Sequence, residues 1–171
     1  MRPGSASSRS FASSQTARIV GITYRQLDYW ARTNLVRPSL AVARGSATRR
    51  RYSYRDLLKL GVIKALLDSG IRLQLIRDVF VPVEKQLERG VAEANLVIQG
   101  TSVTLHRDPD SIAELLRAQP TNLKVLPLAE IKEELDLRIR TVTTLEAMRR
   151  EYFPTVEQSW ENLVATAYHE A

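Results

Sequence analysis

Arginine dominates the chemistry available to this chain, and it gathers at one end. Residues 1–60 hold 12 lysines and arginines, eleven of them arginine, against only Asp28 and Asp56, so this segment carries a net charge of +10. Residues 61–171 carry a net charge of −4. The planar guanidinium can bond two acceptors at once, which suits phosphates and the edge of guanine. The charge distribution therefore predicts a polyanionic partner for the first third of the chain.

Two stretches of this basic segment carry most of the side chains that we expect to contact DNA. In a helix over residues 24–33, Leu27 and Trp30 or Ala31 face inward, and the tyrosines and arginines left outside suit a major groove. Tyr29 is as compatible with packing as with DNA contact. The arginine-rich stretch 44–52 suits phosphates or a narrow minor groove. The predicted DNA-binding residues are Arg18, Thr23, Tyr24, Arg25, Asp28, Tyr29, Arg32, Arg44, Arg49, Arg50, Arg51 and Tyr52.

Capping and turn residues predict the elements that position these side chains. A short helix over 14–20 ends at Gly21, and Thr23 with Gln26 forms a capping box that opens the next helix. The second helix stops at Asn34, so the two helices outline a helix-turn-helix. Residues 40–53 follow as a hairpin, or wing, and a helix over 54–69 lies between Ser53 and Gly70.

The second half of the chain has a different character. A helix from Leu73 is expected to kink or restart at Pro82. Two β-prone runs at 94–99 and 102–106, a helix from Pro109 to Leu116 and a strand from Leu123 make a ββαβ segment. A long amphipathic helix from Leu128 follows, and a further helix begins at Thr155. The apolar stripe of the long helix predicts dimerisation, with packing inside one protomer as the alternative. The predicted dimerisation residues are Ile131, Leu135, Ile139, Val142 and Leu145.

These elements predict an α+β fold that is mainly helical. An N-terminal winged helix-turn-helix precedes the small ββαβ segment and C-terminal amphipathic helices. The predicted organisation is a disordered leader (1–12), a DNA-binding domain (13–81), a connecting helix with a small α/β domain (82–127) and a helical dimerisation or effector region (128–171).

Composition excludes several classes of function. Cysteine is absent, so thiolate metal sites, disulfides and cysteine nucleophiles are absent too. Only His106 and His169 remain as histidines, and no phosphate-binding glycine motif occurs. No apolar run reaches the roughly 20 residues of a membrane span, and the N-terminus lacks the apolar core of a secretory signal. We therefore expect no enzyme activity, no cofactor, no metal and no membrane contact, and a cytoplasmic, nucleoid-associated protein.

Several blocks, in order and at the right spacing, resemble the N-terminal winged helix-turn-helix of MerR-family transcription regulators. The blocks are Gly21-Ile22-Thr23, Leu27-Asp28-Tyr29-Trp30, Leu35-Val36-Arg37-Pro38, Arg50-Arg51-Tyr52-Ser53, Asp56-Leu57 and Gly70-Ile71-Arg72-Leu73-Gln74-Leu75-Ile76. The stretch TYRQLDYWAR looks most like an actinobacterial subgroup that includes regulators of cell division, to whose C-terminal part residues 92–126 are also similar. The resemblance implies a dimer that bends and untwists promoter DNA.

Two departures limit what this resemblance implies. Asp28 stands where many members of the family carry arginine, so that contact does not transfer to this chain. Asp28 can instead orient Arg25 or Arg32, or accept a hydrogen bond from cytosine N4. Metal and redox sensing in the family use cysteines, which this chain lacks.

The leading functional hypothesis is a sequence-specific, homodimeric transcription regulator that binds palindromic double-stranded DNA. RNA polymerase is a further candidate partner, and residues 92–126 a candidate site for an unidentified small ligand or protein. The alternative is an architectural, excisionase-like protein that bends DNA without ligand regulation.

Overall fold

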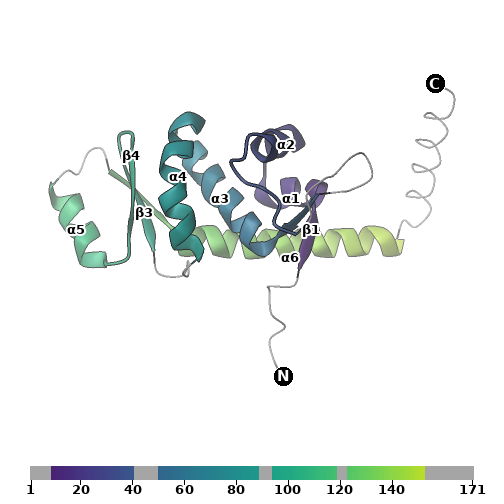
Figure 1. The fold of residues 1–171 in the computed structure, drawn as a ribbon. Helices are drawn as coiled ribbons and strands as arrows, with labels where there is room; N and C mark the ends of the chain where they lie inside the picture. The colour runs from purple at the N-terminus through teal and green to yellow at the C-terminus, as the bar shows by residue number, and fades with distance from the viewer. Residues whose placement is uncertain (1–8, 41–49, 89–93, 119–122, 153–171) are drawn as a thin grey trace.

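The computed structural model describes residues 9–40, 50–88, 94–118 and 123–152. The long helix Leu128–Tyr152 lies along the helices Ser13–Val20 and Tyr54–Asp68. A three-stranded sheet and the helix Pro109–Ala118 lie at the end of the molecule away from the first two helices of the chain (Figure 1). The elements, in chain order, are β1 (Ser10–Ala12), α1 (Ser13–Val20), α2 (Tyr24–Arg32), β2 (Arg51–Ser53), α3 (Tyr54–Asp68), α4 (Leu73–Glu88), β3 (Asn95–Gln99), β4 (Ser102–His106), α5 (Pro109–Ala118), β5 (Leu123–Pro127) and α6 (Leu128–Tyr152).

The turn between α1 and α2 has the cap chemistry that its residues predict. Gly21 ends α1 in the left-handed region with φ of 76°, and its amide donates to the Ala17 carbonyl at 2.9 Å. The Gln26 amide donates to Thr23 Oγ1 at 3.1 Å, and the Thr23 amide donates to Gln26 Oε1 at 2.9 Å. This reciprocal pair fixes the start of α2 relative to the end of α1.

A Gly21→Ala variant is expected to lose about 1 kcal/mol of unfolding free energy, because a Cβ in the left-handed region is strained. That Cβ would also lie 2.5 Å from Nη1 of Arg138, which would have to move. Urea denaturation of the full chain measures the change. Gly61→Ala is the matched control: this glycine is inside α3 and its added Cβ meets only Ile131 Cγ2 at 3.4 Å. An equal loss in both variants would contradict the strain argument.

The predicted disordered leader is wrong for its last residues. Ser10–Ala12 forms β1, which pairs antiparallel with β2 and places Phe11 opposite Tyr52. Both side chains are buried in the core, so burial of Phe11 holds the end of this segment against the domain. Residues 1–8 lie outside the described residues.

The predicted wing falls largely outside the described residues, since residues 41–49 are among those not described. Its two ends are close together: the Leu40 amide donates to the Arg51 carbonyl at 3.3 Å. The Ser53 hydroxyl then accepts from the Asp56 amide, and the Asp56 carboxylate accepts from the Ser53 amide, so the capping box of α3 is present.

The prediction for α4 is a kink or a restart at Pro82. The helix continues without a restart from Leu73 to Glu88, and the kink stays a prediction. Ile76, Phe80 and Val83 are buried in one core on both sides of this position. Tertiary packing therefore holds the helix together across a residue that lacks an amide donor.

The sheet has the strand order β4-β3-β5, and both strand pairs are antiparallel. Leu96 and Ile98 of the central strand join the core shared with the helices, and α4 and α6 contact the flanking strands. In chain order the unit is strand, strand, helix, strand. None of the helices in the described ranges is long and apolar enough to cross a membrane.

Helix α6 completes the core of its own protomer. Leu135, Ile139 and Val142 are buried against α1 and α3, and Ile131 packs partly buried beside them. The intramolecular alternative holds for the three buried side chains, so the assignment of Leu135, Ile139 and Val142 to a dimer interface is corrected. Ile131 is partly exposed and Leu145 is 51% exposed, so both keep surface that a partner can contact and their assignment stays a prediction.

Candidate nucleic-acid interface

Helix α2 has one apolar face and one polar face, as its sequence predicts. Leu27, Trp30 and Ala31 are buried in the core. Tyr24 and Arg25 in the first turn are exposed, as is Arg32 in the last turn. Thr23 stands exposed at the N-cap, where its hydroxyl accepts from Gln26. The outer face can thus reach a base edge with aromatic and guanidinium groups that have no role in the core.

The C-terminal end of α2 is held by a residue of α4. Arg77 donates from Nη1 to the Thr33 carbonyl at 3.0 Å and from Nη2 to Thr33 Oγ1 at 2.5 Å. The same guanidinium lies 5.9 Å from the ring centroid of Tyr29, which is about half exposed. A cation at a helix C-terminus is favourable for the helix dipole. Arg77 therefore fixes both the helix end and the orientation of Tyr29.

An acidic residue stands in the middle of the outer face of α2. Asp28 Oδ1 accepts from Arg50 Nη1 at 2.5 Å, and Asp28 Oδ2 lies 2.9 Å from Arg32 Nε. The hydrogen bond from Arg50 lowers the pKa of Asp28 below its ordinary value of 3.8, against the opposing effect of burial, and the charge of Arg32 adds to the lowering. Asp28 is therefore an anion at neutral pH.

The first two residues of β2, Arg51 and Tyr52, lie on the surface and in the core, respectively. Arg51 is exposed, whereas the Tyr52 side chain is fully buried and its hydroxyl has no hydrogen-bond partner among the described residues. Burial raises the pKa of Tyr52 to about 12. The prediction that Tyr52 contacts DNA is wrong, because its ring fills the core opposite Phe11. Arg44 and Arg49 lie outside the described residues.

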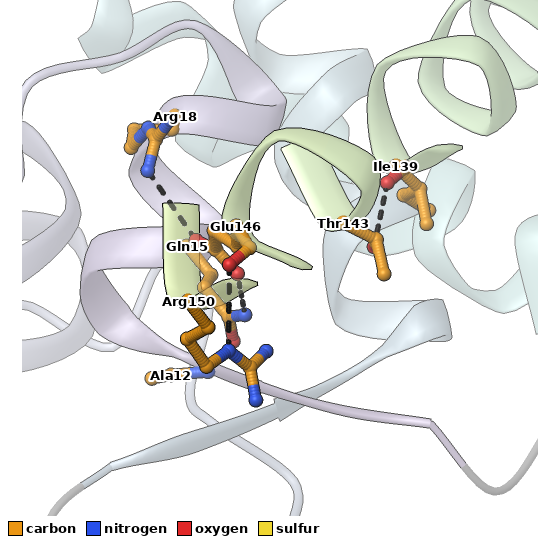
Figure 2. Close-up of polar contacts among 7 residues, drawn as sticks. All are labelled: Ala12, Gln15, Arg18, Ile139, Thr143, Glu146 and Arg150. Carbon is orange, nitrogen blue, oxygen red and sulfur yellow. Dashed lines mark hydrogen bonds and ion pairs between the residues drawn. The ribbon is translucent and has the colours of Figure 1, made fainter. Parts of the chain in front are cut away.

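Arg18 is tied to the long helix. Glu146 of α6 accepts from Arg18 Nη1 at 3.3 Å and also from the Gln15 side-chain amide, so two side chains of α1 meet one carboxylate of α6 (Figure 2). Gln15 in turn accepts from the Ala12 amide at 3.1 Å. The Arg18 side chain keeps about half of its exposure, so this pair does not bury it. The contact couples the helix-turn-helix to α6.

Sequence reasoning missed Arg77 and Glu146. Arg77 is 44 residues from Thr33, and Glu146 is 128 residues from Arg18. No local pattern pairs residues that far apart. Helical periodicity only shows that Arg77 and Glu146 lie on polar faces of their helices.

Potential metal ligands do not cluster in the part of the chain that the structure describes. There, no group of three or more histidine, aspartate or glutamate side chains could hold a metal ion. His106 hydrogen-bonds to Thr104 at 2.9 Å and to Ser111 at 3.3 Å on the strand side of α5. These contacts satisfy both ring nitrogens locally.

The sequence of the two-helix unit and its flanking elements matches a known family. Residues 11–80 match the family model described as MerR HTH family regulatory protein. These residues form a MerR-family helix-turn-helix domain. The resemblance drawn from the sequence blocks is thus confirmed, and the MerR match runs from β1 into α4.

Relatives support the same assignment for the MerR domain. An uncharacterised HTH-type transcriptional regulator of Mycobacterium tuberculosis is 47% identical over 103 residues, which cover 58% of this chain and 44% of that protein. The HTH-type transcriptional regulator GlnR of Bacillus cereus is 37% identical over 67 residues, covering 39% of this chain and 49% of that protein. The chain thus spans less than half the length of each of these relatives.

A solved structure of a MerR-family transcriptional regulator from Bacillus cereus shows a weaker likeness. Its TM-score is 0.39 at 18% identity, with 95% of this chain and 100% of that chain covered. These values are too low for that structure to define the arrangement of the C-terminal half.

Proposed function

We propose that this chain is a DNA-binding transcription regulator that recognises double-stranded DNA through the outer face of α2. The observation that supports this most directly is the pairing of a buried Leu27–Trp30–Ala31 face with an exposed Tyr24 and Arg25 at the start of the same helix. A helix N-terminus with an exposed arginine can bond phosphate through its amides and guanine O6 and N7 through its side chain. The net charge of +10 over residues 1–60 supplies the long-range attraction.

The proposal includes a homodimer that binds a palindromic promoter site and bends or untwists it. One helix-turn-helix contacts little DNA surface, and two-fold pairing lets two copies read two half-sites. Beyond the core, α6 exposes Leu145, Met148 and Tyr152 at spacings of three and four residues, which place them on one helix face. This face is our proposed contact with the second copy.

Selection of bound duplexes from a random library by the purified chain tests the DNA-binding proposal. Footprinting at stated salt on the selected sequence then measures the protected length and its symmetry. A discrete, two-fold symmetric protected region is the expected result. Protection spread evenly over every sequence would instead support the architectural, excisionase-like alternative, and no binding at low salt would refute both.

Arg51 carries a further prediction about the wing. It is exposed at the start of β2, inside the predicted hairpin, and its carbonyl accepts from the Leu40 amide. Arg51→Ala should weaken binding to specific and random DNA about equally and should reduce the slope of log affinity against log salt by about 1, because one phosphate contact is lost. Titrations at four or more salt concentrations give this slope.

Arg117→Ala is the matched control for Arg51→Ala. Arg117 is an exposed arginine in the last turn of α5, far from α2 in the fold (Figure 1). Its removal changes the net charge of the chain equally. The same loss of slope in both variants would mean that overall charge, and not the position of Arg51, accounts for the effect.

A further inference from the structure

The outer face of α2 contains an acidic residue, Asp28, although a surface that binds DNA phosphates normally carries basic residues. Asp28 lies between the two turns that present Arg25 and Arg32, and it is an anion at neutral pH. A carboxylate at this position repels phosphates, so on charge alone it lowers the affinity for every DNA sequence. Its presence therefore needs a compensating role.

The contacts of Asp28 indicate that role. One carboxylate oxygen binds Arg50 and the other binds Arg32. The Asp28 side chain therefore links Arg50, which directly precedes β2, to helix α2. The Arg50 side chain is 21% exposed and that of Asp28 is 29% exposed, so this pair is partly shielded from water. A partly shielded, charge-assisted bond orients a long side chain better than an exposed pair does.

Among the contacts of the described residues, the bonds to Asp28 use only part of the donor capacity of Arg50 and Arg32. A guanidinium has five N–H donors. The bond to Asp28 uses Nη1 of Arg50, and the ion pair with Asp28 engages Nε of Arg32. An unrestrained arginine side chain has on the order of 2 kcal/mol of rotamer entropy, which binding to a phosphate would have to overcome. Asp28 removes part of this cost before DNA arrives.

We propose that Asp28 is a positioning residue that sets Arg50 and Arg32 for phosphate contacts in the specific complex, and that it thereby increases discrimination between the specific site and random DNA. This inference rests on the proposed DNA-binding function. The carboxylate repels the phosphates of any DNA sequence. It also orients two arginines for the arrangement of phosphates in the specific complex, so the gain in affinity from this orientation occurs only at the specific site.

Charge and positioning predict opposite signs for Asp28→Ala. If Asp28 acts only by its charge, its removal raises the affinity for all DNA. If Asp28 positions Arg50 and Arg32, its removal lowers the affinity for the selected site about tenfold, within the range of measured coupling between contacting residues. Affinity for random-sequence duplex of the same length then stays constant or rises. The salt slope at the selected site becomes shallower, because phosphate contacts are lost.

The experiment measures the affinities of five forms of the full chain for the selected duplex and for a random duplex: wild type, Asp28→Ala, Arg50→Ala, the double variant and Asp28→Asn. Positioning predicts that Asp28→Ala has a smaller effect once Arg50 is alanine, because only the pair with Arg32 is then left to lose. Asp28→Asn keeps an acceptor oxygen without the charge, so it should retain part of the discrimination. Asp68→Ala, which removes an exposed acid paired with Lys64 on α3, is the control and should leave discrimination unchanged.

Folding is checked by circular dichroism and by the urea midpoint of each form. Tighter binding of Asp28→Ala to both duplexes would overturn the inference, as would additive effects of Asp28→Ala and Arg50→Ala. A loss of preference at one base pair without coupling to Arg50 would overturn it too, because Asp28 would then read cytosine N4 directly. If the wild type selects no sequence, the proposed function itself fails, which is a distinguishable result.

Discussion

The double variant Leu145→Glu, Met148→Glu is expected to be monomeric and to lose most of its affinity for a palindromic site. These side chains are 51% and 49% exposed and lie on the face of α6 that the core does not cover. Burial of each against a second copy would contribute about 1.5–3 kcal/mol, and two carboxylates there would have to be desolvated. Without the second module, the affinity gained from effective concentration, on the order of 10²–10⁴-fold, is lost.

Sedimentation velocity gives the oligomeric state, and titration of full palindromes against half-sites gives the affinity. The substitution spares the core, because Leu135, Ile139 and Val142 are buried whereas Leu145 and Met148 are about half exposed. Leu116→Glu, at a similarly exposed leucine of α5, is the control and should leave the dimer intact. A dimeric double variant with full affinity would mean that the two copies meet elsewhere on the chain.

Local features of the sequence predict the helix-turn-helix well. Gly21, Asn34 and Gly70 all adopt the left-handed conformation at the helix ends where their residue types favour it. The capping boxes at Thr23 and Ser53 form as expected. These signals act over three or four residues, so the chain needs no tertiary information to encode them.

The partner of an apolar stripe is not a local property. The spacing of Leu135, Ile139 and Val142 shows that one face of α6 is buried, but periodicity is the same whether that face meets α1 and α3 or a second copy. Tyr52 is a related case. Its position among arginines favoured DNA contact, whereas pairing of β1 with β2 places it in the core.

The polar contacts of the candidate interface depend on the fold for the same reason. Asp28 reaches Arg50 across 22 residues, and Arg77 reaches Thr33 across 44. From the sequence, Asp28 could orient Arg25 or Arg32 or read cytosine. The structure shows the pair with Arg32 and adds Arg50, which local spacing could not indicate.

Arg25→Ala is expected to remove about 1–3 kcal/mol of binding to the selected site, which corresponds to roughly 5- to 150-fold in affinity. Arg25 is exposed in the first turn of α2, beside Tyr24 and two residues after the Thr23 cap. A guanidinium there can bond guanine O6 and N7 together, and alanine can bond neither. Random DNA offers no such fixed guanine, so the loss there should be much smaller. Binding titrations on the selected and random duplexes at one salt concentration measure both losses.

Arg37→Ala serves as the control for Arg25→Ala, since Arg37 is an exposed arginine of the same domain that follows α2 and bonds Asn34 Oδ1 at 2.6 Å. Its removal should change both affinities by similar, small factors. Substitution of each base pair of the selected site should then show one position whose preference disappears only with Arg25→Ala. An equal loss on selected and random DNA would show that Arg25 contacts only the phosphate backbone, and base reading by α2 would have to rest on Tyr24 and Tyr29 instead.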